Sequence, residues 1–325
     1  MVVFFYFIRD VLGILFVALI FSSALSPWVS SMEHRGIPRS LGILLIYLSM
    51  LGIVSLAIVL LIPPLVNEYN QLALRFPEYS QRIIQSLNEV SPGIDIFQEF
   101  KRLFASIQSS IVPVAGGVLT RLFDLIGGLV TFFLVFVVTF YMIAEENVIR
   151  KALHSLTPVN AQPYIDELIG KIQRKTGLWL RGQMVLSFLI FLVVFLGLSV
   201  LGVEYALILA IIAGLTEFMP IIGPIIGSIP ALFIAFNQDP LLALWVLALY
   251  WLVQRLENDL LVPRVMQKAV GINPLVSIIA LLIGGKIGGI VGILLAIPVA
   301  TVIMTITLDL LGHDKLSETA PEKAS

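Results

Sequence analysis

Apolar runs separated by short polar turns make up most of the chain. Four of these runs approach the ~20 residues that a helix needs to cross a bilayer: residues 11–29, 41–62, 125–144 and 184–201. Pro27 and Trp28 close the first run, and Pro63 and Pro64 close the second. The pattern predicts transmembrane helices, the first two of which form an N-terminal region of residues 1–64.

Residues 65–123 follow a different, amphipathic pattern. Apolar side chains recur at steps of four, four and three residues, as on one face of a helix: Tyr79, Ile83, Leu87 and Val90. Asp95 and Gln98 have the spacing of a capping box at the start of a further helix. We predict a helical arm outside the bilayer core, and favour a packing or subunit-contact role for it over a ligand-binding one.

Basic residues are unevenly spread along the second half of the chain. Six lysines and arginines fall within residues 145–183, whereas residues 182–254 contain none. The positive-inside rule therefore places residues 145–183, which belong to a region of residues 124–183, in the cytoplasm together with the polar tail at 312–325. Three spans before this connection put the N-terminus outside, so we expect a further hydrophobic segment before Met1.

Two stretches combine apolar runs that are short for a full span with helix-breaking residues. They are residues 206–236 and 274–311, within a predicted transport core of residues 184–311. Paired, short segments interrupted by glycine and proline mark the sites of many secondary transporters. We therefore predict two interrupted helical hairpins, with breakers at Pro220, Gly223, Pro224, Gly227 and Pro230 in the first, and at Gly284, Gly288, Gly292 and Pro298 in the second.

The spacing of the glycines has a structural interpretation of its own. Gly284, Gly288 and Gly292 recur every four residues, and Gly223 and Gly227 do the same. Small residues at this spacing let helix backbones approach closely. We favour this packing role over contact with a substrate.

Glu217 is the sharpest candidate for a functional side chain, because a charge at membrane depth is costly unless it faces protein or a polar cavity. It would accept a proton, a cation or a hydrogen bond from a polar substrate. The alternative is a structural lock for backbone amides freed at Pro220 and Gly223. Lys286 in the second hairpin is a weaker candidate, since its side chain can also extend to the membrane surface.

A second polar cluster follows in the chain. Gln254 reaches Glu257 and Asn258 at i+3 and i+4 of one helix, which we interpret either as a path-lining face or as an interfacial helix end. Arg255 and Asp259 have the spacing of a structural ion pair. Pro263 is expected to end this helix.

Composition sets limits on function. The chain of 325 residues is 58% hydrophobic and 13% charged, whereas soluble domains are about 45–50% apolar and roughly 25% charged. There is no cysteine, and His34, His154 and His313 lie far apart, so we predict no metal site, no cofactor and solvated histidines. A net charge of −1 gives no sign of nucleic-acid binding. Without an HExxH, GxSxG or dinucleotide glycine motif, we predict that the protein is not an enzyme.

These motifs resemble the signature of the autoinducer-2 exporter (AI-2E) family of PerM-type permeases. The resemblance is carried by Gln254 with Glu257 and Asn258, and by residues 35–39 (RGIPR), 217–224 (EFMPIIGP), 261–266 (LVPRVM), 270–275 (VGINPL) and 289–298 (GIVGILLAIP). It implies a bacterial inner-membrane protein associated with export of the quorum-sensing molecule autoinducer-2, and some members resemble sodium- or lithium-for-proton antiporters. It further implies a homo-oligomer, specifically a pentamer. Relatives usually carry another hydrophobic segment before the equivalent of Val11.

The combined expectation is an all-α, polytopic membrane protein with two interrupted hairpins and an amphipathic arm. Its leading function is export of a small polar solute by alternating access; the alternatives are a Na⁺(Li⁺)/H⁺ antiporter using Glu217 or Glu257, and a non-transporting membrane scaffold. The partners are the lipid bilayer and a small polar solute, H⁺ or Na⁺. The predicted path consists of Glu217, Pro220, Gly223, Pro224, Gly227, Pro230, Gln254, Glu257, Asn258 and Lys286, and the predicted hinge or packing positions are Pro263, Gly271, Pro274, Gly284, Gly288, Gly292 and Pro298.

Overall fold

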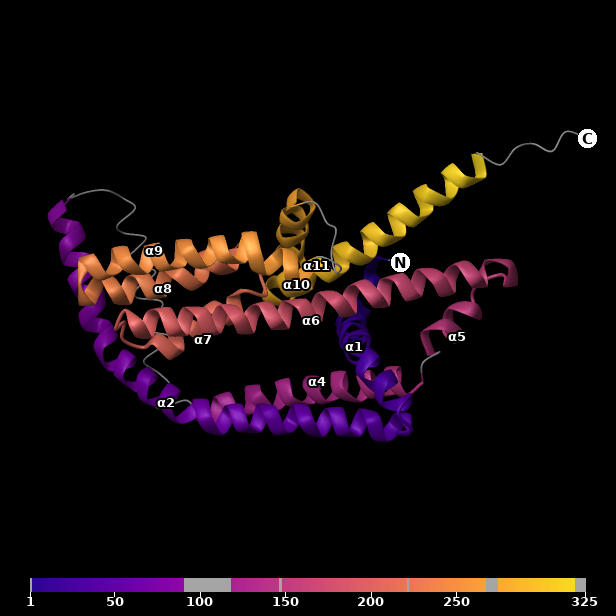
Figure 1. Ribbon diagram of the computed structural model, residues 1–325, viewed down its shortest axis with the longest axis horizontal. Coiled ribbons are helices and arrows are strands. Elements are labelled where there is room, and N and C mark those ends of the chain that lie inside the picture. Colours follow the sequence, from indigo (N-terminus) through magenta and orange to yellow (C-terminus); the bar gives the residue numbers. More distant parts are fainter. Residues whose placement is uncertain (1, 91–117, 146–147, 221, 267–273, 319–325) are drawn as a thin grey trace, which may run out of the picture. The chain divides into compact units, whose positions relative to one another are not determined.

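The computed structural model describes residues 2–90, 118–145, 148–220, 222–266 and 274–318, and these residues form helices joined by short turns, with no strand among them (Figure 1). The prediction of an all-α fold is confirmed. In chain order the elements are α1 (Val2–Glu33), α2 (Arg39–Val90), α4 (Val118–Ala144), α5 (Val148–His154), η2 (Val159–Ala161), α6 (Gln162–Val200), α7 (Ala206–Thr216), α8 (Ile222–Gln238), α9 (Pro240–Leu256), η3 (Glu257–Leu261), α10 (Val262–Met266) and α11 (Pro274–Glu318).

Five segments within the described residues are long and apolar enough to cross a membrane: Val11–Glu33, Arg39–Arg82, Val159–Val200, Pro240–Val265 and Leu275–Asp309. Large apolar side chains are also exposed along them, including Leu51, Ile53 and Val59, each more than 60% exposed. A soluble protein rarely exposes such a continuous apolar surface, whereas lipid covers it at no cost. The chain is an integral, polytopic membrane protein.

The chain folds into two compact units. The first consists of Met1–Ser49, Thr131–Val185 and Val262–Ser325, and the second of Met50–Val130 and Leu186–Leu261. The first unit contains α1, the basic part of α6 and α11. The second contains α7, α8, α9 and most of α2, and it holds both Glu217 and Glu257.

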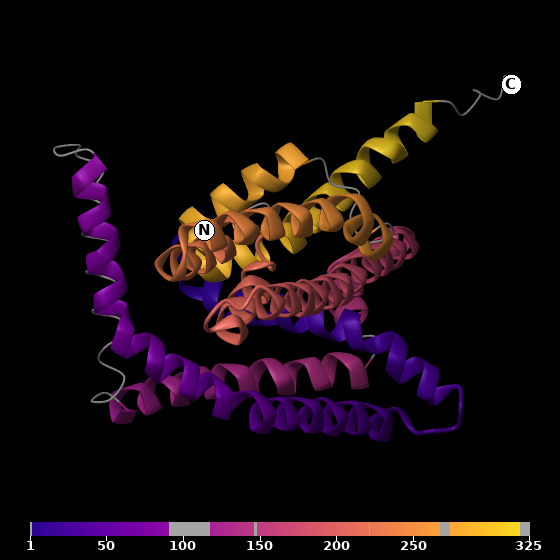
Figure 2. The ribbon, with the colours of Figure 1, turned by 60° about the vertical axis from the view of Figure 1, so that its left-hand side comes forward.

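Several prolines lie inside helices that the sequence predicted to end there. Helix α1 continues through Pro27 to Glu33, and α2 continues through Pro63, Pro64 and Pro77. The predictions that Pro27 and Pro63 close their helices are therefore wrong. A proline inside a helix removes one hydrogen bond and bends the axis, but neighbouring helices in a membrane protein compensate for it. Helix α2 changes direction along its length accordingly (Figure 2).

Pro27 has a visible consequence for packing in the first unit. It has no N–H to donate to the Ser23 carbonyl, the usual i−4 partner. Gly177 of α6 lies against that same carbonyl, and a Cβ at Gly177 would be 2.3 Å from the Ser23 oxygen. The absent side chain of one residue and the absent N–H of the other thus allow α1 and α6 to approach closely.

The polar connection and the following span form one helix, α6. The structure confirms the i,i+4 pair on it, with Lys171 Nζ 2.8 Å from Glu167 Oε1. Lys171 also reaches Asp309 of α11, and Lys175 Nζ donates to Thr305 Oγ1 at 3.2 Å. These contacts join the basic part of α6 to α11 within the first unit.

His154 differs from its predicted solvated state. Its Nε2 lies 3.0 Å from Asp166 Oδ1 and its side chain is 29% exposed, so it takes part in a hydrogen bond between α5 and α6. His34 is exposed. The predicted roles of Asp95, Gln98, Gly271 and His313, and the side chains of Ile83, Leu87 and Val90, lie outside what the structure describes.

The described part of the predicted arm packs within the second unit. The Phe76 ring lies 5.5 Å from that of Phe233 on α8, between ring centroids. Tyr79 Oη donates to Glu204 Oε2 at 2.8 Å, and Arg75 Nη1 lies 3.2 Å from Glu204 Oε1. This part of α2 therefore covers the turn between α6 and α7.

Glu68 of α2 supplies the N-terminal cap that α7 does not have in its own sequence. The residue before α7, Tyr205, has φ 60° and makes no side-chain capping bond. Instead, Glu68 Oε2 accepts a hydrogen bond from Ile208 N at 3.0 Å. A carboxylate at a helix N-terminus satisfies a free amide and interacts favourably with the helix dipole.

Replacing Glu68 by alanine is expected to destabilise the second unit by about 1 kcal/mol, the usual cost of losing a helix cap. Thermal unfolding of the purified protein in detergent measures the effect. The matched control is Glu78→Ala on the same helix, since among the described residues Glu78 forms an exposed ion pair with Arg82, and such a pair contributes little. Equal unfolding temperatures for the two variants would show that Glu68 does not act as a cap.

Candidate functional site

A small enclosed cavity lies among α6, α7, α8 and α9 of the second unit. Its volume is about 10 Å³, close to the minimum that holds one water molecule. Both polar and apolar side chains line it: Glu217, Tyr250, Gln254 and Glu257, with Ile190, Val194, Ala213, Pro224 and Val253. Four of the residues predicted for the transport path, Glu217, Pro224, Gln254 and Glu257, meet here.

Glu217 sits where α7 ends. Only 2% of the residue is exposed. The backbone amides around the break bond to backbone carbonyls: Met219 N donates to Thr216 O at 2.8 Å, and Gly223 N donates to Met219 O at 2.7 Å. These amides do not need the carboxylate, which argues against the structural-lock interpretation of Glu217.

Glu257 is the first residue of an irregular helical turn. Helix α9 passes into the π-helical segment η3 and then into α10, which contains Pro263 in its first turn. The prediction that Pro263 ends the helix is wrong, because the chain stays helical through Pro263 to Met266. Glu257 is 6% exposed, and Gln254 Nε2 donates to Glu257 Oε2 at 3.3 Å, as the i,i+3 spacing predicted.

The cavity does not include the other residues of the predicted polar cluster, Asn258, Arg255 and Asp259. Asn258 is exposed and does not line the cavity. The ion pairs within the described residues include none between Arg255 and Asp259; the Arg255 guanidinium lies 5.5 Å from the centre of the Trp251 ring instead. A π turn has more residues per turn than an α-helix, so the i+4 residue is rotated away from Arg255.

Glu217 and Glu257 line the same cavity, with their carboxyl groups within reach of a hydrogen bond between them. A carboxylate has no donor, so a hydrogen bond between two carboxyl groups requires a proton on one of them. Among the described residues lining the cavity, none is a lysine, arginine or histidine. Two carboxyl groups without a cationic neighbour can bind and release a proton or coordinate a small cation.

Glycines hold the first hairpin tightly closed around this site. A Cβ at Gly223 would be 2.0 Å from the Thr216 carbonyl oxygen, and one at Gly227 would be 3.0 Å from Ala213 Cα. Gly223 of α8 lies against Thr216 of α7, and Gly227, further along α8, lies against Ala213, further back along α7. The two helices are therefore antiparallel. Pro220 in the turn and Pro230 inside α8 are half-buried and do not line the cavity.

Tyr250 is a cavity residue that the sequence analysis missed. Its hydroxyl donates to Gly227 O at 3.2 Å and so links α9 to the glycine-rich face of α8. Its spacing from Gln254 and Glu257, at i+4 and i+7, places all three on one helical face. This periodicity is the signal that would have identified it.

The second predicted hairpin belongs to the first unit. Helix α11 consists of two arms that meet at Gly289, whose φ of 57° and ψ of −137° are not helical. Gly284 and Gly292 contact each other across this turn, whereas Gly288 has open space around it. Lys286 is exposed, Pro274 is the first residue of α11, and Pro298 is buried. The structure does not group Lys286 with Glu217.

Comparison with known proteins finds similarity along nearly the whole chain. Residues 1–312 match the family described as AI-2E family transporter. YrrI of Bacillus subtilis, a candidate transport protein, is 26% identical over 84% of this chain and 78% of its own length. The AI-2 transport protein TqsA of Escherichia coli is 26% identical over 86% of this chain and 80% of its own length. The chain belongs to the AI-2E family of membrane transporters.

Proposed function

We propose that this protein is a proton-coupled secondary transporter, in which Glu217 and Glu257 together carry the coupling proton. The observation that carries the proposal is the meeting of two buried carboxyl groups in one small cavity that no lysine, arginine or histidine lines among the described residues. Charge is costly in such a place unless it is paired. The pair therefore retains a proton while the cavity is closed and releases it when water reaches the site.

Opening would come from the interrupted hairpin. Helices α7 and α8 meet at Pro220, and α8 contacts α9 through the hydrogen bond from Tyr250 to Gly227. Movement of the hairpin away from α9 would break this bond and connect the carboxyl pair to water. Because Pro220 lies in the turn and Pro224 in the first turn of α8, bending there would break only short turn bonds such as Met219 N to Thr216 O and would leave the regular helical bonds of α7 and α8 intact.

For the transported species we propose a small polar solute, exported by alternating access. The relative named as an AI-2 transport protein supports this choice. A cavity of about 10 Å³ cannot hold such a solute. Solute binding would require the hairpin to open.

The second candidate is exchange of a monovalent cation for a proton. The size of the cavity favours it, because a volume of about 10 Å³ suits one water or one small ion, and two carboxyl groups with the Gln254 amide supply oxygen ligands. In this mechanism Na⁺ or Li⁺ would displace the proton from the pair.

We also propose that residues 145–183 and the C-terminal tail face the cytoplasm of a bacterial inner membrane. The excess of lysine and arginine in that connection, and their absence from residues 182–254, support this orientation. A homo-oligomer remains part of the proposal on the basis of the family resemblance.

Proteoliposome flux measurements test the function. Vesicles with an internal pH dye are given a pH gradient, and autoinducer-2, sodium and lithium are supplied separately. Solute export predicts gradient-driven autoinducer-2 movement in sodium-free buffer, abolished by a protonophore. Cation exchange predicts an internal pH change on adding Na⁺ or Li⁺ alone. Absence of both responses would refute proton-coupled transport and leave the scaffold interpretation.

A further inference from the structure

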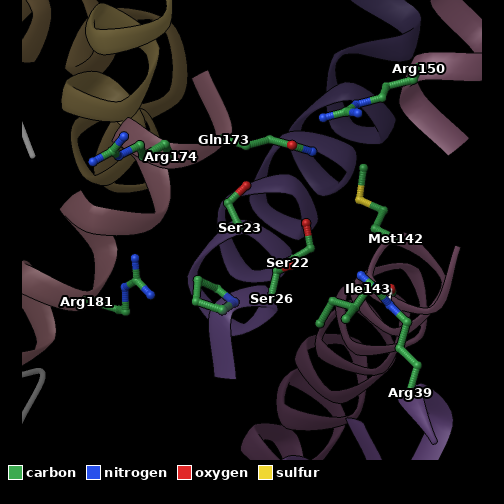
Figure 3. A pocket seen from close by; sticks show the side chains of 11 residues that line it. Ser22, Ser23, Ser26, Arg39, Met142, Ile143, Arg150, Gln173, Arg174 and Arg181 are labelled. Carbon is green, nitrogen blue, oxygen red and sulfur yellow. Dashed lines mark hydrogen bonds between the residues drawn. The ribbon is translucent and has the colours of Figure 1, made fainter. Parts of the chain in front are cut away.

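A polar cavity in the first unit lies far in sequence from the carboxyl pair, and its function is unassigned. Its volume is about 210 Å³, against roughly 30 Å³ for one water in the liquid. Figure 3 shows three serines of α1 at its centre, between two arginines of α6 on one side and Arg39 of α2 and Arg150 of α5 on the other. The polar lining residues are Ser22, Ser23, Ser26, Arg39, Arg150, Gln173, Arg174 and Arg181.

The close packing of α1 on α6 builds this cavity. Gly177 lies against the Ser23 carbonyl, so Arg174 and Arg181 of α6 are brought beside the serines of α1. The two arginines are seven residues apart and therefore share one face of the helix. The cavity is thus a consequence of the close contact between Gly177 and the Ser23 carbonyl.

The charges around the cavity are not balanced. Arg39 donates from Nε to Ile143 O at 2.7 Å and pairs with Glu33 at 3.2 Å. Arg150 lies 3.8 Å from Asp166. Within the described part of the chain no carboxylate pairs with Arg174 or Arg181, and no aspartate or glutamate lines the cavity.

The remaining polar groups suit a ligand with many acceptor oxygens. The hydroxyls of Ser22 and Ser23 already donate to Leu19 O, at 3.0 and 2.6 Å, so the arginines supply the free donors. A guanidinium offers its N–H groups in a planar fork that matches the oxygens of a phosphate in a bidentate manner. A neutral solute or a cation would leave these positive charges uncompensated.

We propose that this cavity is a binding site for a phosphate group, with Arg174 and Arg181 as its principal ligands. Two kinds of molecule present a phosphate group to such a site: an anionic lipid, through its headgroup, and a free phosphate ester. Trp28, next to the lining residue Pro27, is exposed, and exposed tryptophan is typical of the headgroup level of a bilayer. The site therefore lies where either source can reach it.

The test measures phosphate binding to the purified full-length protein. Native mass spectrometry compares retention of phosphatidylglycerol with that of phosphatidylcholine, and equilibrium binding of radiolabelled inorganic phosphate and glycerol phosphate is measured on delipidated protein. We expect at least one arm to show binding that weakens with added salt. Selective lipid retention identifies the headgroup as the source, and binding in the second arm identifies the free phosphate ester.

Variants of the lining arginines test whether phosphate binds in this cavity. Arg174→Gln with Arg181→Gln breaks no contact described above, and we expect it to weaken binding by about tenfold or more, the effect of losing charge-assisted hydrogen bonds. The matched control is Arg35→Gln, an exposed arginine near Arg39 that does not line the cavity. The double lysine variant should restore part of the binding, which separates a folding defect from loss of charge. Equal binding by the wild type and the glutamine variant, or no binding in either arm, would overturn the proposal.

Discussion

Replacing Glu217 by glutamine is expected to reduce proton-coupled transport by about 100-fold or more, the effect of removing a group that transfers a proton. Glutamine has nearly the same shape and can still hydrogen-bond Glu257, so the cavity should remain folded. Its amide cannot release or bind a proton in the physiological range. The transport rate in proteoliposomes should lose its dependence on pH as well as its magnitude.

Two further variants sharpen this prediction. Glu257→Gln should have the same effect, because one shared proton requires both carboxyl groups. Glu78→Gln should leave transport unchanged, since that side chain is exposed, at 58%, on α2 of the same unit. Wild-type rate and pH dependence in Glu217→Gln, with normal gel-filtration behaviour, would remove the carboxyl pair from the mechanism.

Replacing Gly292 by alanine is expected to have the largest effect on stability, about 3 kcal/mol, at the upper end of the usual cost of overpacking. A Cβ at this position would lie 1.9 Å from the Gly284 carbonyl oxygen. The obstructing atom belongs to a helix backbone, which cannot rotate away as a side chain can. The two arms of α11 would have to separate, and the thermal unfolding temperature in detergent should fall.

Gly288 is the control for this prediction, because it belongs to the same four-residue repeat. A Cβ there meets nothing within 4 Å. Gly288→Ala should therefore be neutral or slightly stabilising, since alanine favours a helix over glycine by about 1 kcal/mol. If both alanine variants unfold at the same temperature, the close approach of Gly284 and Gly292 does not hold the hairpin together.

The carboxyl pair could be found in the sequence only in part. Glu217 stood out because a charge interrupts an apolar stretch beside Pro220, and Glu257 because it shares a helical face with Gln254. Both signals are local. That the two carboxyl groups meet in one cavity depends on the packing of both α7 and α9 against α8, and nothing in the spacing of the two residues predicts it.

The prolines likewise could be interpreted only in part from the sequence. Their positions identify where helical hydrogen bonds are lost, but the outcome depends on what packs nearby. Pro220 lies in the turn between α7 and α8, whereas α1 passes through Pro27 and α2 through Pro63 and Pro64. Pro27 is accommodated because Gly177, far away in the chain, packs against the carbonyl that it leaves free.

The sequence by itself determined that this chain crosses a membrane as helices, where those helices are interrupted, and which side chains are too polar for their surroundings. These properties depend on composition and short-range periodicity, which act within a few turns of helix. The tertiary structure alone decided that Glu217 meets Glu257, that Lys286 belongs to the other unit, and that arginines from separate segments surround one cavity. Such contacts arise because each helix must cover its neighbour's small residues and satisfy its polar groups, and those partners come from distant parts of the chain.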